Sequence, residues 1–137
     1  MRDRLTEKEA DFISVARVGR LATVGSAGMP HVVPICHILD EGLIVFATPV
    51  TSVKARNMAA EPQVSLVFDD YTEFWEDLAQ VVVQGRAGMI TAGPEFRRYR
   101  DLIYAKFPQY PTAADGISEE EDAMVMVSVE RVASDGL

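Results

Sequence analysis

The stretch GRLATVGSAGMPHVVPICHILDEGLIVFAT, residues 19–48, decides the fold. Within it, turn signals that contain glycine, GSAG and then DEG, separate runs of β-prone residues. Strands joined by such short turns predict an antiparallel meander. The three predicted strands are Leu21–Val24, His31–Leu39 and Leu43–Thr48. Pro34 lies in the middle run, and because proline has no backbone N–H it predicts a sheet edge, a bulge or a break there.

Helical patterns flank this meander. Thr6 and Glu9 form a capping-box pattern that opens a predicted helix over Glu7–Ala16. Downstream of the meander, Thr51 or Ser52 is placed to cap a second helix. A third helix begins at a proline, which suits the first helical turn. The remaining predicted elements are helices Val53–Ala60 and Pro94–Lys106, strands Val64–Phe68, Gln80–Ile90 and Ala123–Ala133, and an acidic aromatic loop with some helix over 69–80.

The order helix, three strands, helix, two strands, helix, strand predicts a mainly β, α+β fold. Six mostly antiparallel strands of these lengths favour a closed or split barrel flanked by short helices. No internal repeat or long linker divides the chain. We therefore expect residues 1–137 to form a single domain.

The composition narrows the classes of function. The chain is 48% hydrophobic and 25% charged, with a formal net charge of -8, which disfavours nucleic-acid binding because that needs a basic surface. The single cysteine excludes an intrachain disulfide. The charged N-terminal residues lack the apolar core of a signal peptide, and no apolar run is long enough to cross a bilayer. We expect a cytoplasmic protein that binds neither membrane nor nucleic acid.

An anion site is predicted where the meander meets the second helix. Lys54 would lie in the first turn of that helix, where backbone N–H groups are free and the helix dipole is positive. Thr48, Thr51 and Ser52 add hydroxyl groups, so the segment can cradle a phosphate. Asn57 falls on the same helix face as Lys54, whereas Arg56 does not. The alternative is a solvated surface lysine beside a capped helix.

Other residues carry weaker signals. His31 and His37 would share one face of a regular strand and offer acid–base groups, but two half-buried histidines are the simpler reading. Cys36 has apolar neighbours and is predicted to be a small buried side chain. No spacing of His, Cys or carboxylates indicates a metal site. The cluster Arg97, Arg98 and Arg100 indicates an anion contact or a solvated helix face, and Tyr71, Phe74 and Trp75 indicate a pocket mouth, a dimer contact or plain packing.

An ordered series of motifs resembles a known family. The motifs are L-A-T-V, P-H-V-V-P, K-x-R-N, P-x-V-S-L and V-x-G-R-A, spread over about residues 6–134. In this order they resemble the pyridoxamine 5′-phosphate oxidase-like split barrels that bind flavins, and within them the coenzyme F420-dependent branch. The resemblance implies a six-stranded split barrel of the FMN-binding type. It also implies a homodimer with the cofactor, FMN or the deazaflavin F420, in a groove at the dimer interface.

The resemblance also implies roles for particular residues. Lys54 matches the family's phosphate-binding lysine, and the segment from Thr48 through Thr51 to Ser52 matches its phosphate-side loop. The K-x-R-N motif adds Arg56 and Asn57 to this predicted site. Val33, Pro34, Ile35 and Cys36 match the strand beside the flavin-type ring, and His37 is a candidate proton donor.

Two positions depart from the family pattern. Ser52 replaces a second basic residue, and Asp135 replaces a tryptophan. A carboxylate beside an anionic cofactor would repel it. The implied function is an oxidoreductase that transfers hydride to or from a small organic substrate. Its alternatives are a carrier of a flavin, a deazaflavin or a haem-related group without turnover, and a structural dimer that has lost its cofactor.

Overall fold

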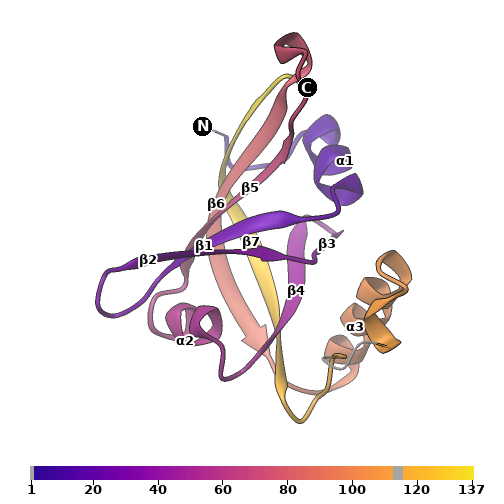
Figure 1. Cartoon of the computed structure of the whole chain (residues 1–137). Coiled ribbons are helices and arrows are strands. Elements are labelled where there is room, and N and C mark those ends of the chain that lie inside the picture. The colour runs from indigo at the N-terminus through magenta and orange to yellow at the C-terminus, as the bar shows by residue number, and fades with distance from the viewer. Residues whose placement is uncertain (1, 113–115) are drawn as a thin grey trace.

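The computed structural model describes residues 2–112 and 116–137. Figure 1 shows a strongly twisted antiparallel sheet with three helices around it. The helices are α1 (Glu7–Val15), α2 (Val53–Ala60) and α3 (Pro94–Lys106). The strands are β1 (Gly19–Val24), β2 (Pro30–Ile35), β3 (Ile38–Asp40), β4 (Leu43–Pro49), β5 (Gln63–Asp70), β6 (Ala79–Ile90) and β7 (Asp122–Asp135).

The strands form one sheet in the order β2-β1-β5-β6-β7-β4-β3, with every neighbouring pair antiparallel. This half-barrel confirms the predicted mainly β split-barrel fold. The strand count is seven rather than six, because the predicted strand His31–Leu39 divides into β2 and β3 at Cys36 and His37. Pro34 lies on β2, an outermost strand of the sheet, which is a position where a residue without a backbone N–H is tolerated.

Two glycines allow the sheet to turn and bend. The β3–β4 hairpin turns through Glu41 (φ 49°) and Gly42 (φ 82°), the positive-φ pair of a tight two-residue turn. On β6 the register with β7 shifts between Gln84 and Gly85. A Cβ on Gly85 would lie 2.2 Å from the backbone oxygen of Ser128, so only glycine permits this close approach. The resulting bulge bends the two longest strands.

The apolar side chains form two buried clusters. One fills the half-barrel beneath α1 and centres on Ile13, Phe46 and Phe68. The other lies between α3 and the strands β4 and β7, and includes Phe96 and Ile103. The predicted helices α2 and α3 agree with the structure to the residue, and α1 ends one residue before the predicted boundary.

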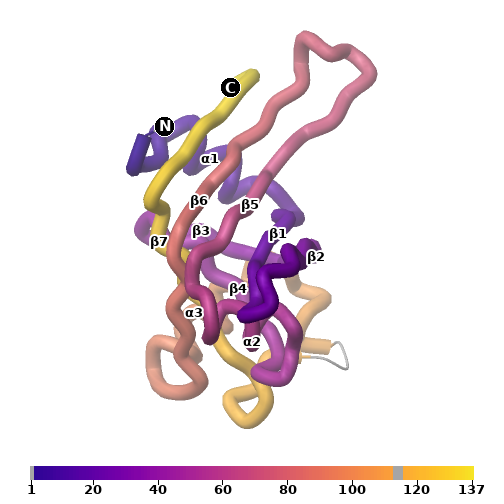
Figure 2. The backbone as a smooth tube through the Cα atoms, turned by 90° about the vertical axis from the view of Figure 1, so that its left-hand side faces the viewer, coloured from indigo at the N-terminus to yellow at the C-terminus, as the bar shows by residue number. Residues whose placement is uncertain are grey.

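The predicted loop with some helix over 69–80 is confirmed for residues 71–78, and its two ends belong to the strands of a hairpin. Strands β5 and β6 continue to the pair Asp70 and Ala79, and a single 3₁₀ turn at Trp75–Asp77 closes the connection. Figures 1 and 2 show this hairpin projecting beyond the other strands.

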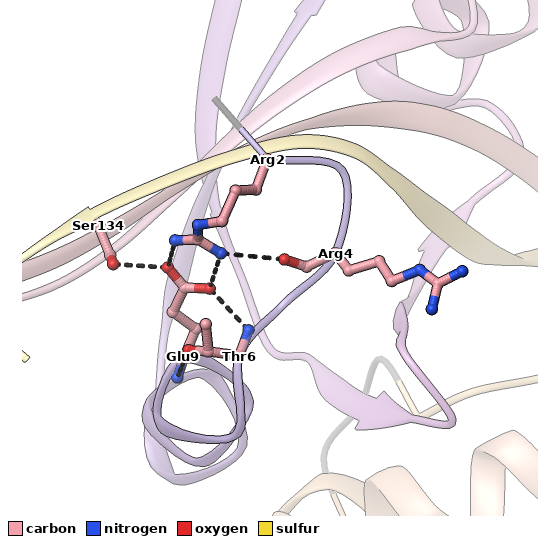
Figure 3. Close-up of polar contacts among 5 residues, drawn as sticks. All are labelled: Arg2, Arg4, Thr6, Glu9 and Ser134. Carbon is pink, nitrogen blue, oxygen red and sulfur yellow. Dashed lines mark hydrogen bonds and ion pairs between the residues drawn. The ribbon is translucent and has the colours of Figure 1, made fainter.

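A buried carboxylate joins the N-terminal segment to the last strand (Figure 3). Glu9 accepts from the Arg2 guanidinium, from the Ser134 hydroxyl and from the backbone N–H of Thr6, which completes the predicted capping box. Arg2 also pairs its backbone with Val132 of β7. These bonds, led by that of Arg2, lower the pKa of Glu9 to about 2. The segment before α1 is therefore tied to the sheet.

We predict that this carboxylate makes stability fall in acid. Because the pKa of Glu9 is lower in the folded state than in the unfolded chain, its contribution is complete above pH 4.5 and is lost as pH falls toward 2. The loss should be roughly 2–3 kcal/mol. Chemical denaturation of wild type and Glu9→Gln over this range should show a much flatter pH dependence in the variant. Glu7→Gln, at an exposed position of the same helix, should keep the wild-type slope.

Candidate cofactor site

A cleft of about 380 Å³ lies where the last residues of β2 and β4 meet the start of α2 and the segment after α3. Its walls combine apolar side chains with a few polar groups. The lining residues are Pro34, Ile35, Cys36, Ala47, Thr48, Pro49, Lys54, Gln109 and Tyr110. None of the nine is acidic, although the chain carries a net charge of -8.

The local sequence after β4 sets the position of α2. The backbone N–H of Ser52 donates to the carbonyl of Pro49 at 3.0 Å, which closes a turn. The Ser52 hydroxyl accepts from the N–H of Ala55 at 3.1 Å and so caps the helix. It also lies 2.9 Å from the hydroxyl of buried Thr48. Of the two predicted N-cap residues, Ser52 caps the helix and Thr51 does not. Lys54 lies in the first turn of α2, as predicted.

Lys54 is half-buried at the cleft wall. Burial lowers the pKa of its ammonium. In residues 2–112 and 116–137, no hydrogen bond or ion pair to Lys54 is found. The N–H groups of Val53 and Lys54 belong to the first turn, where helices leave donors unpaired. A partly desolvated cation beside such donors fits a phosphate, so the residues present suit a phosphate-bearing cofactor.

The β2 wall of the cleft is an open sheet edge. Strand β2 pairs only with β1, so the backbone of Pro34 and Ile35 is not covered by another strand. Cys36 is exposed, and the prediction that it is buried was wrong. Ile35 faces the core at 5% exposure, and side chains alternate along a strand, so Cys36 falls on the same outer side as Pro34.

His37 does not line the cleft. Its side chain is fully buried, its ring lies 4.7 Å from the Phe68 ring, and its Nε2 donates to the carbonyl of Ile13 at 2.8 Å. Burial lowers the pKa of His37 to about 4. The burial alternation of β2 continues to His37, but β2 itself ends at Ile35, and His31 is only partly buried whereas His37 is fully buried. The geometry of this chain thus gives His37 a packing role and does not favour the proton-donor role.

Five other predicted site residues also lie outside the cleft lining. Asn57 donates to the hydroxyl of Thr23 at 3.0 Å and so braces α2 against β1. Val33, Thr51 and Arg56 are absent from the lining, and the latter two are exposed. Ser52 is adjacent through its contact with Thr48. The structure therefore brings together Pro34, Ile35, Cys36, Thr48 and Lys54 of the predicted set.

Sequence reasoning missed part of the wall. Gln109 and Tyr110 follow α3 and reach the cleft from more than fifty residues away in the sequence. Their only local signal is the proline-rich stretch FPQYP after the helix. Ala47 and Pro49 flank Thr48 on β4, and because side chains alternate along a strand, the predicted role of Thr48 did not indicate its two neighbours.

Lys106 lies behind the cleft, next to the Cys36 end of its β2 wall, and hydrogen-bonds to two other segments. Its ammonium donates to the carbonyls of Ala16 at 2.8 Å and His37 at 2.9 Å, and burial lowers its pKa to about 8. The neighbouring guanidinium of Arg17 donates to the carbonyl of Lys106 at 3.0 Å. These contacts join α1, α3 and the β2–β3 connection next to Cys36.

Asp135, the departure from the family pattern, lies elsewhere. It pairs with Gln80 on β6 and lines a separate hollow with Asp69 and Asp70. It therefore does not face Lys54 within one chain. The arginine cluster of α3 also turns away from the cleft lining, with Arg98 paired to Asp40 and Glu95, and Arg97 paired to Glu119.

A second hollow of about 390 Å³ lies on the sheet between β1, β5, β6 and β7. It contains Glu130 beside Arg131 and is not next to a helix N-terminus. The Lys54 cleft is the better match for an anionic ligand. Among the described residues, no group of three or more His, Cys, Asp or Glu is arranged to hold a metal ion. No helix in the described part of the chain is long and apolar enough to span a membrane.

An antiparallel half-barrel with an acid-free, cationic cleft at its open edge defines the chain as a split-barrel protein. The chain belongs to the pyridoxamine 5′-phosphate oxidase family, whose sequence profile matches residues 5–134.

One curated relative and two solved structures resemble this chain. It is 37% identical over 98 residues to a 5a,11a-dehydrotetracycline/5a,11a-dehydrooxytetracycline reductase of Streptomyces rimosus, a match that covers 68% of this chain and 69% of the relative. A conserved hypothetical protein from Mycobacterium tuberculosis superposes with a TM-score of 0.82 at 25% identity, covering 98% and 87% of the two chains. An F420 reductase superposes with a TM-score of 0.75 at 16% identity, covering 94% and 98%, which shows a shared fold.

We predict that His37 stays neutral in the folded protein until the pH approaches 4. Its pKa is lower in the folded state, so stability is complete above pH 6.5 and declines as pH falls toward 4, because the unfolded chain takes up a proton first. His37→Leu should abolish roughly 3 kcal/mol of that dependence. Proton NMR of the ring, assigned with a His31→Gln variant, checks the titration. A His37 ring that titrates near pH 6.5 would contradict the burial argument.

Proposed function

We propose that this protein is an oxidoreductase that binds a flavin-type cofactor, coenzyme F420 or FMN, and transfers hydride between it and a small organic substrate. The observation that carries the proposal is Lys54, a half-buried cation without an acidic neighbour in the cleft lining, at the N-terminus of α2. The reductase named for the relative from Streptomyces rimosus supports redox chemistry. The family resemblance and the fold shared with an F420 reductase favour the deazaflavin over FMN.

Each part of the cleft has a task in this proposal. The cofactor would supply the hydride chemistry, and the protein supplies position and electrostatics. Lys54 and the first-turn N–H groups of α2 bind the phosphate, and the Thr48 and Ser52 hydroxyls lie beside them. The β2 wall from Pro34 to Cys36 lies along the ring. Ile35, Ala47 and Pro49 exclude water from that side.

A homodimer with the cofactor groove at the subunit interface belongs to the same proposal. The cleft of one chain is bounded on the β2 side by an open strand edge and is exposed to solvent along its mouth. A second subunit would cover this mouth and exclude water from the ring, which strengthens the electrostatic contacts inside.

A non-catalytic carrier of the same cofactor is the second candidate. The lining of the cleft favours it, because it offers few groups for acid–base chemistry. Among the lining residues that the structure describes, the titratable side chains are those of Cys36, Lys54 and Tyr110. Hydride transfer needs no side-chain nucleophile, so this lining is compatible with both functions. Reduction of the bound cofactor followed by a substrate screen separates them, because a carrier binds the cofactor and leaves its redox state unchanged.

The first experiment titrates the purified protein with F420 and with FMN in parallel. We predict that Lys54→Ala weakens binding of the favoured cofactor by roughly 1.5–3 kcal/mol, or roughly 10- to 150-fold, because a charged hydrogen bond to phosphate is lost. Arg56→Ala removes a cation two residues away outside the cleft and should bind as wild type does. Equal dissociation constants for wild type and Lys54→Ala would remove Lys54 from the site. Failure of wild type to bind either cofactor would overturn the proposed function.

Cys36 provides a readout that does not depend on activity. It is exposed, lines the cleft and is the single cysteine of the chain. We predict that iodoacetamide alkylates it in the free protein and that saturating cofactor slows this reaction at least about tenfold by covering the β2 wall. Mass spectrometry of intact protein measures the rate. In Lys54→Ala the same cofactor concentration should protect less, and undiminished alkylation in the saturated wild type would place the ring elsewhere.

A further inference from the structure

The short connection between β2 and β3 joins the two outermost strands of the sheet. Among the described residues, β2 pairs with β1 alone and β3 pairs with β4 alone. Cys36 and His37 are the residues between them, and they run from one edge of the sheet to the other without belonging to a strand ladder. Because no ladder hydrogen bonds fix this connection, contacts outside the sheet must fix it.

The side chain of His37 makes one of those contacts. Its Nε2 donates to the carbonyl of Ile13 at 2.8 Å, and its ring packs against that of Phe68. Its other ring nitrogen, Nδ1, is buried and has no hydrogen-bond partner among the residues that the structure describes. The buried ring therefore ties the connection to α1 through a single hydrogen bond.

Lys106, the last residue of α3, supplies a second anchor for the connection. Its ammonium donates to the backbone carbonyl of His37 at 2.9 Å and to that of Ala16 at 2.8 Å. Hydrogen bonds from a charged donor are stronger than those between neutral groups. One ammonium group thus holds the β2–β3 connection to the end of α1 and to the end of α3.

The same ammonium links two parts of the cleft lining. One part ends at Cys36, which directly precedes the His37 carbonyl that Lys106 binds. The other part consists of Gln109 and Tyr110, which follow Lys106 in the same segment of the chain. The separation of these two parts therefore depends on the hydrogen bond from Lys106.

The segment that follows Lys106 is itself held in place. Arg17 donates to the carbonyl of Lys106 at 3.0 Å, and its guanidinium lies 4.6 Å from the centroid of the Phe107 ring. Phe107 is buried, and its carbonyl accepts from the backbone N–H of Tyr110 at 2.9 Å. The turn that carries Tyr110 is thus fixed relative to Lys106, so a bond from Lys106 to the β2–β3 connection sets the cleft at its Cys36 end.

We propose that Lys106 is a positioning residue for the flavin-type ring, because its bond to the His37 carbonyl keeps the Cys36 end of the β2 wall at a fixed distance from the segment after α3. This inference rests on the proposed function, and it adds a residue that does not line the cleft. Lys54 acts on the cofactor phosphate, whereas Lys106 acts on the ring through the β2 wall. The two lysines therefore affect different parts of the same ligand.

Ligands that share a ring and differ in phosphate separate the two lysines. The probes are FMN with riboflavin, and F420 with its phosphate-free deazaflavin alcohol. We expect Lys106→Met to weaken binding of both members of a pair by the same factor, at least about fivefold, because the ring wall shifts. Lys54→Ala should weaken binding of the phosphate-bearing member alone. Lys106→Arg keeps a cation that can donate to two carbonyls, so it should regain most of the lost affinity.

Glu9→Gln is the matched control for a loss of stability. It removes the buried carboxylate that joins the N-terminal segment to β7, outside the cleft lining. It should lower the free energy of unfolding and leave the affinity for the ring-only ligands unchanged. Equal affinities of wild type and Lys106→Met for the ring-only ligand, or a loss confined to the phosphate-bearing ligand, would overturn the inference and leave the proposed function standing.

A spin-label experiment needs no cofactor, so it tests the anchoring by itself. Cys36 is exposed and is the single cysteine of the chain, so a nitroxide can be attached to it alone. We expect the EPR spectrum to show faster motion of the nitroxide in Lys106→Met than in wild type, and slower motion again in Lys106→Arg. Identical spectra for wild type and Lys106→Met would overturn the inference, since Cys36 would then be held without Lys106.

The two experiments together distinguish the failures. Faster nitroxide motion in Lys106→Met, combined with a wild type that binds none of the four ligands, would overturn the proposed function and the ring role with it. Faster motion combined with an equal loss of both ligands of a pair supports the inference.

Discussion

The close approach of β6 to β7 at Gly85 is the constraint on which the rest of the structure depends. These are the two longest strands, and every other strand joins the sheet through them. A side chain at Gly85 would collide with the backbone of Ser128, so the glycine permits the bulge that bends this pair. Because the pair is bent, β2 and β4 can converge near α2 instead of lying on a flat sheet.

The site follows from this convergence together with local helix chemistry. The Ser52 cap starts α2 directly after β4, which holds Lys54 at the cleft wall. The open edge of β2 supplies the facing wall, and Lys106 ties the β2–β3 connection to α1 and α3. A partly desolvated cation, free helix donors and an apolar wall are thus brought together from segments that are separate in sequence, which is the arrangement that an anionic, planar cofactor needs.

The distribution of charge divides the surface into two kinds of region. On the exposed surface, cationic side chains form ion pairs with acidic ones. Examples are Arg20, Arg97 and Arg98. The lining of the cleft contains no acidic residue, and residues 69–78 of the β5–β6 hairpin contain no basic residue. In the proposed function, the acid-free lining is what lets a protein of net charge -8 hold an anionic cofactor.

Local sequence determined the elements of this protein, because capping, turn chemistry and period-two patterning act over a few residues. Neighbouring residues predicted the Thr6–Glu9 capping box, the turn at 40–42 and the place of Lys54 in the first turn of α2. For Pro34 they left a sheet edge, a bulge or a break open. Tertiary structure alone decided that Gln109 and Tyr110 complete the cleft, that Asn57 braces β1, and that His37 is buried against Phe68 while its neighbour Cys36 is exposed. Those outcomes depend on where β2 ends and on contacts between segments far apart in the chain, and no local pattern encodes such distances.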